Sequence, residues 1–257
     1  MDILYRDDVL VAVHKPSGLL VHRSMLDRHE TRFALQIVRD LTGRRVHAVH
    51  RLDKGTSGVL LFAFEREAAT ALAQAFEQRT VGKRYVALVR GHPAPAGVID
   101  HPLRRHEDEA GRTLPDGPLQ EAVTRWRTLE RFELPVRVDR YPSSRYALLE
   151  LEPETGRRHQ LRRHMKHVSH PILGDATWGK GAHNRMIAAR YGVARLLLAC
   201  TALEFGHPLD GRRIRIECPP SGDFLRVLDG LRAEGALPAP GDSRHNDAPI
   251  PCRRNDS

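Results

Sequence analysis

The chain has 257 residues, of which 40% are hydrophobic and 28% charged, a balance typical of a folded globular protein rather than a disordered one. Lys and Arg total 41 against 32 Asp and Glu, and the net charge of +9 favours a polyanionic partner such as nucleic acid. No apolar run approaches the roughly 20 residues that cross a bilayer, and three cysteines form no disulfide framework, so we expect a cytoplasmic protein without a membrane partner.

The N-terminal part predicts alternating strands and helices. ILYR and VLVAV, on either side of Asp7-Asp8, predict paired strands that end at Pro16-Ser17-Gly18. TRFALQIVRDLTG predicts an amphipathic helix that stops at Gly43, with one apolar face formed by Phe33, Ile37, Val38 and Leu41. Three further elements follow: a buried strand in GVLLFAF, a second helix in REAATALAQAFEQ and another strand in KRYVALVRG.

The remainder predicts an irregular surface excursion over residues 91–120, three strands in YALLELEPE, LLLACTALEF and RRIRIEC, and helices in RRHQLRRHMKHV and FLRVLDGLRAEG. Strands in consecutive pairs with intervening helices indicate a mixed α+β fold, a largely antiparallel central sheet flanked by helices and loops. We expect one folded domain over residues 1–234. Residues 235–257 lack apolar periodicity and predict a disordered C-terminal tail.

The segment HRLDKGTSG places His50, Arg51 and Asp53 within four positions. The carboxylate could belong to a buried ion pair, to a hydrolase triad with His50 and Ser57, or to a nucleophile. A G-x-S-x-G nucleophile elbow is absent from the sequence, so the hydrolase interpretation lacks support. The local pattern does not decide between an ion pair and a nucleophile.

A second cluster joins histidines to cations: His159, His164, His167 and His170 alternate with Arg157, Arg158, Arg162, Arg163 and Lys166. The histidines suggest a zinc site, but H-E-x-x-H and C-x-x-C are missing and the neighbouring cations would repel a metal ion. A basic helix facing RNA explains the pattern better than zinc does. A merely solvated charged face is the remaining alternative.

Three motifs in this order, HRLDKGTSGVLLFA, KRYVALVRG and GRRHQLRRH, resemble the pseudouridine synthases of the RluA type. The opening DDVLVAVHKPSGLLVH is similar to the first strand pair and turn of that family, and the resemblance extends from Ile3 to Pro219. RYPSSRYALLELEPETGRRHQLRRH, HPILGD and YGVARLLLACTAL most resemble the TruC branch (tRNA pseudouridine synthase C), which modifies tRNA. The resemblance implies a pseudouridine synthase catalytic domain.

Site roles follow from the same resemblance. It implies that Asp53 is the catalytic aspartate, that Arg162 pairs with it, and that Tyr85 lies against the target uracil. It also implies that Arg51 enters the duplex where the base leaves, because the enzyme must flip the nucleotide to reach its sugar. A guanidinium partner favours the ionised carboxylate, which would attack C1′ or remove a sugar proton; the residues leave both open. Further RNA contacts are expected from His50, Arg157, Arg158, Arg163 and Lys166.

The resemblance implies isomerisation of a specific uridine, in tRNA where the T stem meets the acceptor stem. The same isomerisation on ribosomal RNA is an alternative, and a catalytically silent RNA-binding protein is another. No metal or cofactor is expected, and we expect a monomer. Three features depart from the family pattern and bear on substrate fit: His14 before Lys-Pro, Ala199-Cys200 after the leucines, and Arg158 within GRRHQ.

Overall fold

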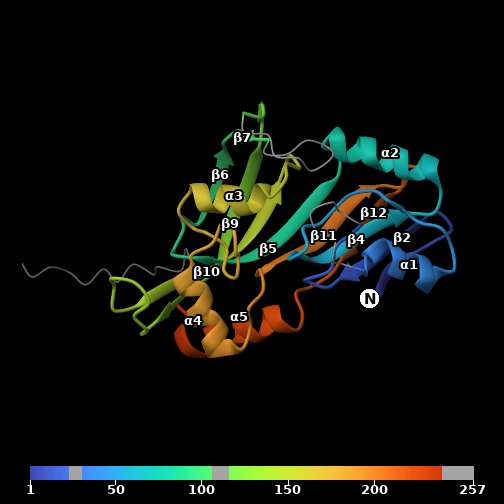
Figure 1. Cartoon of the computed structure of the whole chain (residues 1–257). Helices are drawn as coiled ribbons and strands as arrows, with labels where there is room; N and C mark the ends of the chain where they lie inside the picture. Colours follow the sequence, from blue (N-terminus) through green and yellow to red (C-terminus); the bar gives the residue numbers. More distant parts are fainter. Residues whose placement is uncertain (23–30, 106–115, 239–257) are drawn as a thin grey trace, which may run out of the picture.

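A ten-stranded mixed sheet runs through the protein, whose computed structural model describes residues 1–22, 31–105 and 116–238 (Figure 1). In spatial order its main strands are β1 (Ile3–Arg6), β2 (Leu10–Lys15), β4 (Ser57–Ala63), β11 (Leu198–Gly206), β5 (Gly82–Arg90), β10 (Ser144–Pro153), β9 (Val123–Leu134) and β6 (Ala96–Asp100). β3 (His47–Ala48) pairs with β4, and β12 (Arg213–Glu217) with β11. The sheet and its helices confirm the expected α+β class.

The two halves of the sheet join at β4 and β11, the one parallel pair among the described strands. At this join Gly58 adopts a φ of 111°, and a Cβ there would lie 2.0 Å from the backbone oxygen of Cys200. Glycine is therefore required for the two backbones to approach so closely. The loop that carries Asp53 leads directly into β4, which places this residue at the join.

The helices α3 (Gln160–His167), α4 (Gly181–Tyr191) and α5 (Asp223–Gly235) cover both faces of the second half. Because side chains alternate along a strand, Ala87 and Val89 of β5 belong to the same core as Leu161 and Met165 of α3. The next residues along, Val86 and Leu88, belong instead to the core with α4 and α5. In Figure 1, α4 and α5 lie together below the sheet while α3 lies across its other side.

The first half packs against α1 (Ala34–Thr42) and α2 (Arg66–Glu77), and all seven residues of β4 are buried. The helix α1 ends as predicted at Gly43, which has a φ of 67°. The predicted apolar face was wrong in one respect: Leu41 is 48% exposed. The buried positions within the helix are Ala34, Val38 and Thr42. Residues four positions apart lie on the same face of a helix, so these three form its buried face.

Two elements escape the sequence pattern. β9 is a 12-residue strand that alternates charged and apolar residues at the sheet margin, and α4 has only His183 and Ile187 buried. The predicted irregular excursion also contains β6, which forms the sheet edge, and the two-stranded pair β7 (Leu103–Arg104) and β8 (Leu119–Gln120). The sequence pattern did not predict β9 or α4, because each has few buried apolar residues and its hydrophobic periodicity is weak.

The C-terminal boundary lies slightly beyond the expected residue 234. α5 continues to Gly235, and the backbone N–H of Leu237 donates to the Arg131 carbonyl at 2.9 Å. The packed part of the chain therefore includes at least residue 237. The predicted tail, residues 235–257, falls for the most part outside the described residues, since 239–257 are not among them.

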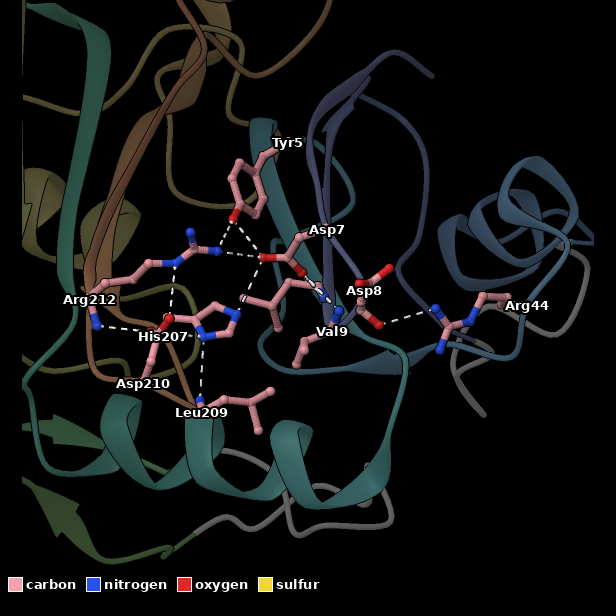
Figure 2. A network of polar contacts seen from close by, with 10 residues as sticks. Tyr5, Asp7, Asp8, Val9, Arg44, His207, Leu209, Asp210 and Arg212 are labelled. Atoms are coloured by element: carbon pink, nitrogen blue, oxygen red, sulfur yellow. Dashed lines mark hydrogen bonds and ion pairs between the residues drawn. The ribbon is translucent and has the colours of Figure 1, made fainter.

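A polar network ties the turn after β1 to the turn between β11 and β12 (Figure 2). Asp7 accepts hydrogen bonds from the Tyr5 hydroxyl at 2.6 Å and from the backbone N–H groups of Val9 and Leu10. Arg212 donates to the same carboxylate at 3.3 Å, and the His207 ring lies 3.3 Å from it. The network thereby fixes the β1–β2 pair to β11 and β12.

Candidate active site

The loop that carries Asp53 packs against the end of β2 and the turn that follows it. Lys15 is fully buried, and its ammonium donates to the backbone carbonyls of Pro16, Leu19 and Lys54. The backbone N–H of Gly18 also donates to the Lys54 carbonyl, at 2.7 Å. Burial lowers the pKa of Lys15 to about 7, although the nearby Asp53 opposes this shift. These contacts to Lys54 fix the backbone directly after Asp53.

Arg162 lies between two carboxylates. Its Nη1 donates to Asp53 Oδ2 at 3.1 Å, while its Nε and Nη2 form a two-pronged contact with Asp175 at 2.7 and 2.9 Å. The Asp175 side chain is completely buried, whereas Asp53 is 19% exposed. Asp175 therefore anchors the guanidinium from behind and Asp53 remains the carboxylate open to a ligand.

The charges of this triad are mutually stabilised. Burial raises the pKa of Asp175, but hydrogen bonds from Arg162 and from the backbone N–H groups of Trp178 and Thr177 outweigh it and lower the pKa overall. Burial disfavours the Arg162 charge, yet its hydrogen bonds to Asp175 and the fields of both aspartates raise its pKa. Arg162 is therefore a permanent cation that donates a hydrogen bond to Asp53 at 3.1 Å.

Tyr85 of β5 lies directly opposite Cys200 of β11 in the strand register. Burial, the Cys200 thiol and its hydrogen bond, and the field of Asp53 raise the pKa of Tyr85 well above its usual value. The hydroxyl is therefore protonated at neutral pH. The departure from the family pattern at Cys200 thus touches the site, because Cys200 lies opposite Tyr85 in the sheet and contributes to the raised pKa of its hydroxyl.

His159 begins α3 in the left-handed conformation, with a φ of 53° and a ψ of 26°. Its Nε2 lies 3.9 Å from Asp53 Oδ2, and its Nδ1 accepts a hydrogen bond of 3.3 Å from the Trp178 indole. Burial lowers the pKa of His159, with Asp53 opposing and Arg162 and Arg158 reinforcing the shift. The imidazole is consequently neutral near pH 7.

These side chains surround a pocket of about 170 Å³ at the join of the two half-sheets. Asp53, Tyr85 and Arg162, which the sequence predicted to act together, all line it although they come from three distant segments. Arg51 is exposed at its margin. The lining also includes Lys83, Arg157, Arg158 and His159, so the pocket is rich in cations and imidazole.

The remaining predicted RNA contacts extend from the pocket along α3. Arg163 and Lys166 stand over the Trp178 ring, 5.7 and 5.1 Å from its centroid. Arg157 precedes the helix and donates to the Glu121 carbonyl at 2.9 Å, while Arg158 and Lys166 are solvent-accessible. The predicted basic surface therefore consists of a loop part beside the pocket and a helical part around Trp178.

His50 does not fit the predicted RNA contact. Its Nε2 accepts a hydrogen bond from the Leu61 backbone N–H at 3.1 Å, and its ring stacks on Phe76 at 4.8 Å. Burial lowers the pKa of His50 to about 4, with Lys83 adding to the shift. The ring is a neutral packing group between β4 and α2, so we no longer assign it to RNA.

The other histidines of α3 also have structural partners. His164 is fully buried and bonds through its two ring nitrogens to Thr124 and to the His101 carbonyl. His167 stacks on the ring of His101 with centroids 3.7 Å apart.

Within residues 1–22, 31–105 and 116–238, no three His, Cys, Asp or Glu side chains are grouped so as to hold a metal ion. The same residues include no helix long and apolar enough to span a membrane.

Sequence reasoning missed three residues of this site. Asp175 lies in HPILGD, a segment noted only for its resemblance, and nothing local indicates that its carboxylate meets Arg162. Lys15 stands between an apolar strand and Pro16, where the local pattern indicates only the start of a turn, and nothing in it predicts that the ammonium is buried. Trp178 carries no local pattern that points to the site.

The fold, by comparison with solved structures and a family model, is that of a class of RNA-modifying isomerases, and its central basic pocket holds a carboxylate and guanidinium pair. The structure of human RNA pseudouridylate synthase domain containing 4 has a TM-score of 0.67 to this chain and 28% sequence identity, and the match covers 90% of this chain and 92% of that one. The family model for RNA pseudouridylate synthase matches residues 9–167. The chain belongs to this family, as its motifs indicated.

Two relatives of known name are similar over most of the chain. The tRNA pseudouridine synthase C of Pasteurella multocida is 49% identical over 231 residues, covering 89% of this chain and 95% of the relative. That of Pectobacterium carotovorum is 45% identical over 240 residues, covering 93% of this chain but only 64% of the relative. These matches confirm the resemblance to the tRNA-modifying branch, as well as the assignment to the isomerases.

Proposed function

We propose that this protein converts one uridine of tRNA to pseudouridine, with Asp53 as the catalytic carboxylate. The ion pair between Asp53 and Arg162 carries the proposal, because it holds a partly exposed carboxylate in a basic pocket, open to a ligand. The names of the relatives favour tRNA, and the resemblance of the motifs favours a uridine where the T stem meets the acceptor stem. A tRNA substrate also fits a cytoplasmic protein.

The reaction breaks the C1′–N1 bond of the target uridine, joins C1′ to C5 of the same uracil and moves one proton from C5 to N1. It has no net change of oxidation state, so the proposal requires no cofactor. Asp53 would act on the sugar as a carboxylate, and the hydrogen bond from Arg162 would keep it aimed at the pocket. Asp53, Tyr85 and Arg162 come from one chain, which is compatible with an active monomer.

Tyr85 would form the floor against which the flipped uracil lies. Its pKa is raised well above the usual value, so the hydroxyl is protonated, and we assign the flat apolar ring, rather than a phenolate, to the base. Arg51 would occupy the space that the flipped nucleotide vacates, since an exposed guanidinium at the margin of the pocket can both stack and bind phosphate.

The basic surface around the pocket would hold the RNA backbone. Its members are Arg157, Arg158, Arg163 and Lys166. The positive charges supply affinity that is largely independent of sequence, whereas stem shape and base flipping select the target. The protein's net charge of +9 acts in the same direction.

The experiment supplies purified protein with total tRNA and, separately, with ribosomal RNA, both labelled with tritium at C5 of uridine. Release of tritium from tRNA, with the modified position then mapped, is the expected result. Release from ribosomal RNA alone would mean that the substrate is ribosomal RNA rather than tRNA, while the uridine isomerisation would stand. No release from either RNA would contradict the isomerase assignment and favour a silent RNA-binding protein.

A further inference from the structure

His159 faces the proposed catalytic carboxylate but does not bond to it. Its Nε2 and Asp53 Oδ2 are 3.9 Å apart, which is too long for a direct hydrogen bond. The residue also adopts a φ of 53°, a conformation uncommon for residues other than glycine. Such backbone conformations persist where the surrounding structure enforces them, and they are frequent at functional sites. The spacing between His159 Nε2 and Asp53 Oδ2 therefore suggests that a ligand atom binds between them.

The Trp178 indole determines which ring nitrogen of His159 carries the proton. An indole N–H can only donate, so Nδ1 of His159 must accept its hydrogen bond. In a neutral imidazole the proton then resides on Nε2, and burial lowers the pKa of His159 so that the ring is neutral near pH 7. An N–H donor and a carboxylate acceptor therefore confront each other across the pocket.

One oxygen placed about 2.8 Å from each atom spans such a gap, and it must both accept from Nε2 and donate to the carboxylate. A hydroxyl does both, whereas a carbonyl cannot donate. Building on the function proposed above, we propose that His159 and Asp53 together bind the ribose 2′-hydroxyl of the flipped uridine. His159 is then a substrate-contacting residue that selects ribose over deoxyribose.

The position of the hydroxyl fits the chemistry at the neighbouring carbon. C1′ is bonded directly to the carbon that bears the 2′-hydroxyl, so binding of that hydroxyl at Oδ2 leaves the other carboxylate oxygen beside C1′. The contact would hold the sugar in register for the reaction while the base lies against Tyr85. A site built in this way tells RNA from DNA at the target position, where the 2′-hydroxyl is the distinguishing group.

The test compares binding of two tRNAs that differ only at the mapped target, which is uridine in one and 2′-deoxyuridine in the other. Binding is measured with the Asp53→Asn protein, which keeps an acceptor oxygen and is expected not to turn the RNA over. We expect about tenfold tighter binding of the ribose form, the value of one well-made hydrogen bond. Adding His159→Phe should lower the ratio severalfold by weakening only the ribose form, while the acceptor oxygen at position 53 retains the remainder of the preference.

His159→Gln, in the same Asp53→Asn protein, retains an N–H donor and should preserve part of the preference. Trp178→Phe removes the group that fixes the tautomer and should lower the ratio without abolishing binding of the deoxyribose form. An unchanged ratio in the His159→Phe protein, or no ribose preference before that change, overturns the proposal. Failure of the proposed function is seen separately, as absence of pseudouridine in the wild-type reaction that maps the target.

Discussion

Arg162 Nη1 donates a hydrogen bond to Asp53 Oδ2 at 3.1 Å, and this contact joins residues that are 109 positions apart in the sequence. It connects the first turn of α3 to the loop that enters β4. The guanidinium cannot swing away, because Asp175 holds its other two nitrogens from a fully buried position. The site is therefore prepared before RNA arrives.

Replacing Asp53 by Asn should abolish turnover while leaving tRNA binding close to that of the wild type. Asn keeps the shape of the side chain but lacks the charge needed to act on the sugar. Tritium release from uridine labelled at C5 measures turnover, and filter binding measures affinity. Substantial turnover by Asp53→Asn protein would remove the mechanism proposed here.

Asp175→Asn should lower both stability and turnover, although the residue does not line the pocket. Removal of this buried charge leaves Arg162 incompletely paired, which costs about 3 kcal/mol in the free energy of unfolding. Turnover should fall at least about tenfold because Arg162 no longer holds Asp53 in one orientation. Urea denaturation and tritium release are the measurements.

The matched control is Asp223→Asn, which removes a partly exposed carboxylate that pairs with Arg226. Its cost should stay below about 1 kcal/mol, because exposed ion pairs contribute little. Equal effects of the two changes would contradict the anchoring role of Asp175.

Alanine at Arg157, Arg158, Arg163 and Lys166 together should weaken tRNA binding and flatten its dependence on salt. The slope of log affinity against log salt should fall by about one for each phosphate that the altered surface no longer binds. A control protein with alanine at Arg39, Arg190, Arg226 and Arg232 removes the same amount of charge from α1, α4 and α5. If both proteins show the same slope as the wild type, the basic surface is only solvated.

Arg51→Ala should reduce turnover most on a target uridine within a folded stem. The side chain is proposed to fill the vacated stack, a role that a target base already unpaired does not need. Kinetics on an intact tRNA and on a fragment with the target unpaired provide the comparison. Equal losses of turnover on both substrates would leave Arg51 as a structural part of the loop.

Asp7→Asn should destabilise the protein at neutral pH by about 1–2 kcal/mol. Burial raises the pKa of Asp7, but hydrogen bonds from Tyr5, Val9 and Leu10 outweigh it and hold the pKa below its usual value. A lowered carboxyl pKa stabilises the folded state above the unfolded pKa, and this contribution disappears as pH falls through the folded value.

The difference between wild-type and Asp7→Asn protein should therefore shrink below about pH 4. Thermal denaturation from pH 7 to pH 3 measures it. Asp8→Asn is the control, because Asp8 lies next to the network without joining its carboxylate to it, and the change should alter stability by no more than about 0.5 kcal/mol. A difference for Asp7→Asn that stays constant over this range would contradict the assigned role of its charge.

The sequence by itself determined the elements with strong periodicity and the identity of the central motif. Seven buried positions in a row bear out the strand predicted at β4, and the glycine after α1 predicted where that helix ends. The predicted trio of Asp53, Tyr85 and Arg162 came from motif resemblance, and the fold brings all three to one pocket. Local sequence patterns predicted these features because the burial of β4 and the end of α1 depend on residues adjacent in the sequence.

Only the tertiary structure decided which groups meet across long separations. Asp175 behind Arg162, Cys200 beside Tyr85 and Trp178 against His159 each join groups whose contact depends on how the chain folds back on itself. It also gave His50 a packing role against Phe76 in place of the predicted RNA contact, because a histidine's role depends on what packs around its ring. Hydrophobic periodicity specifies which face of an element is buried, but burial, tautomer and charge pairing are set by partners that the chain supplies from elsewhere.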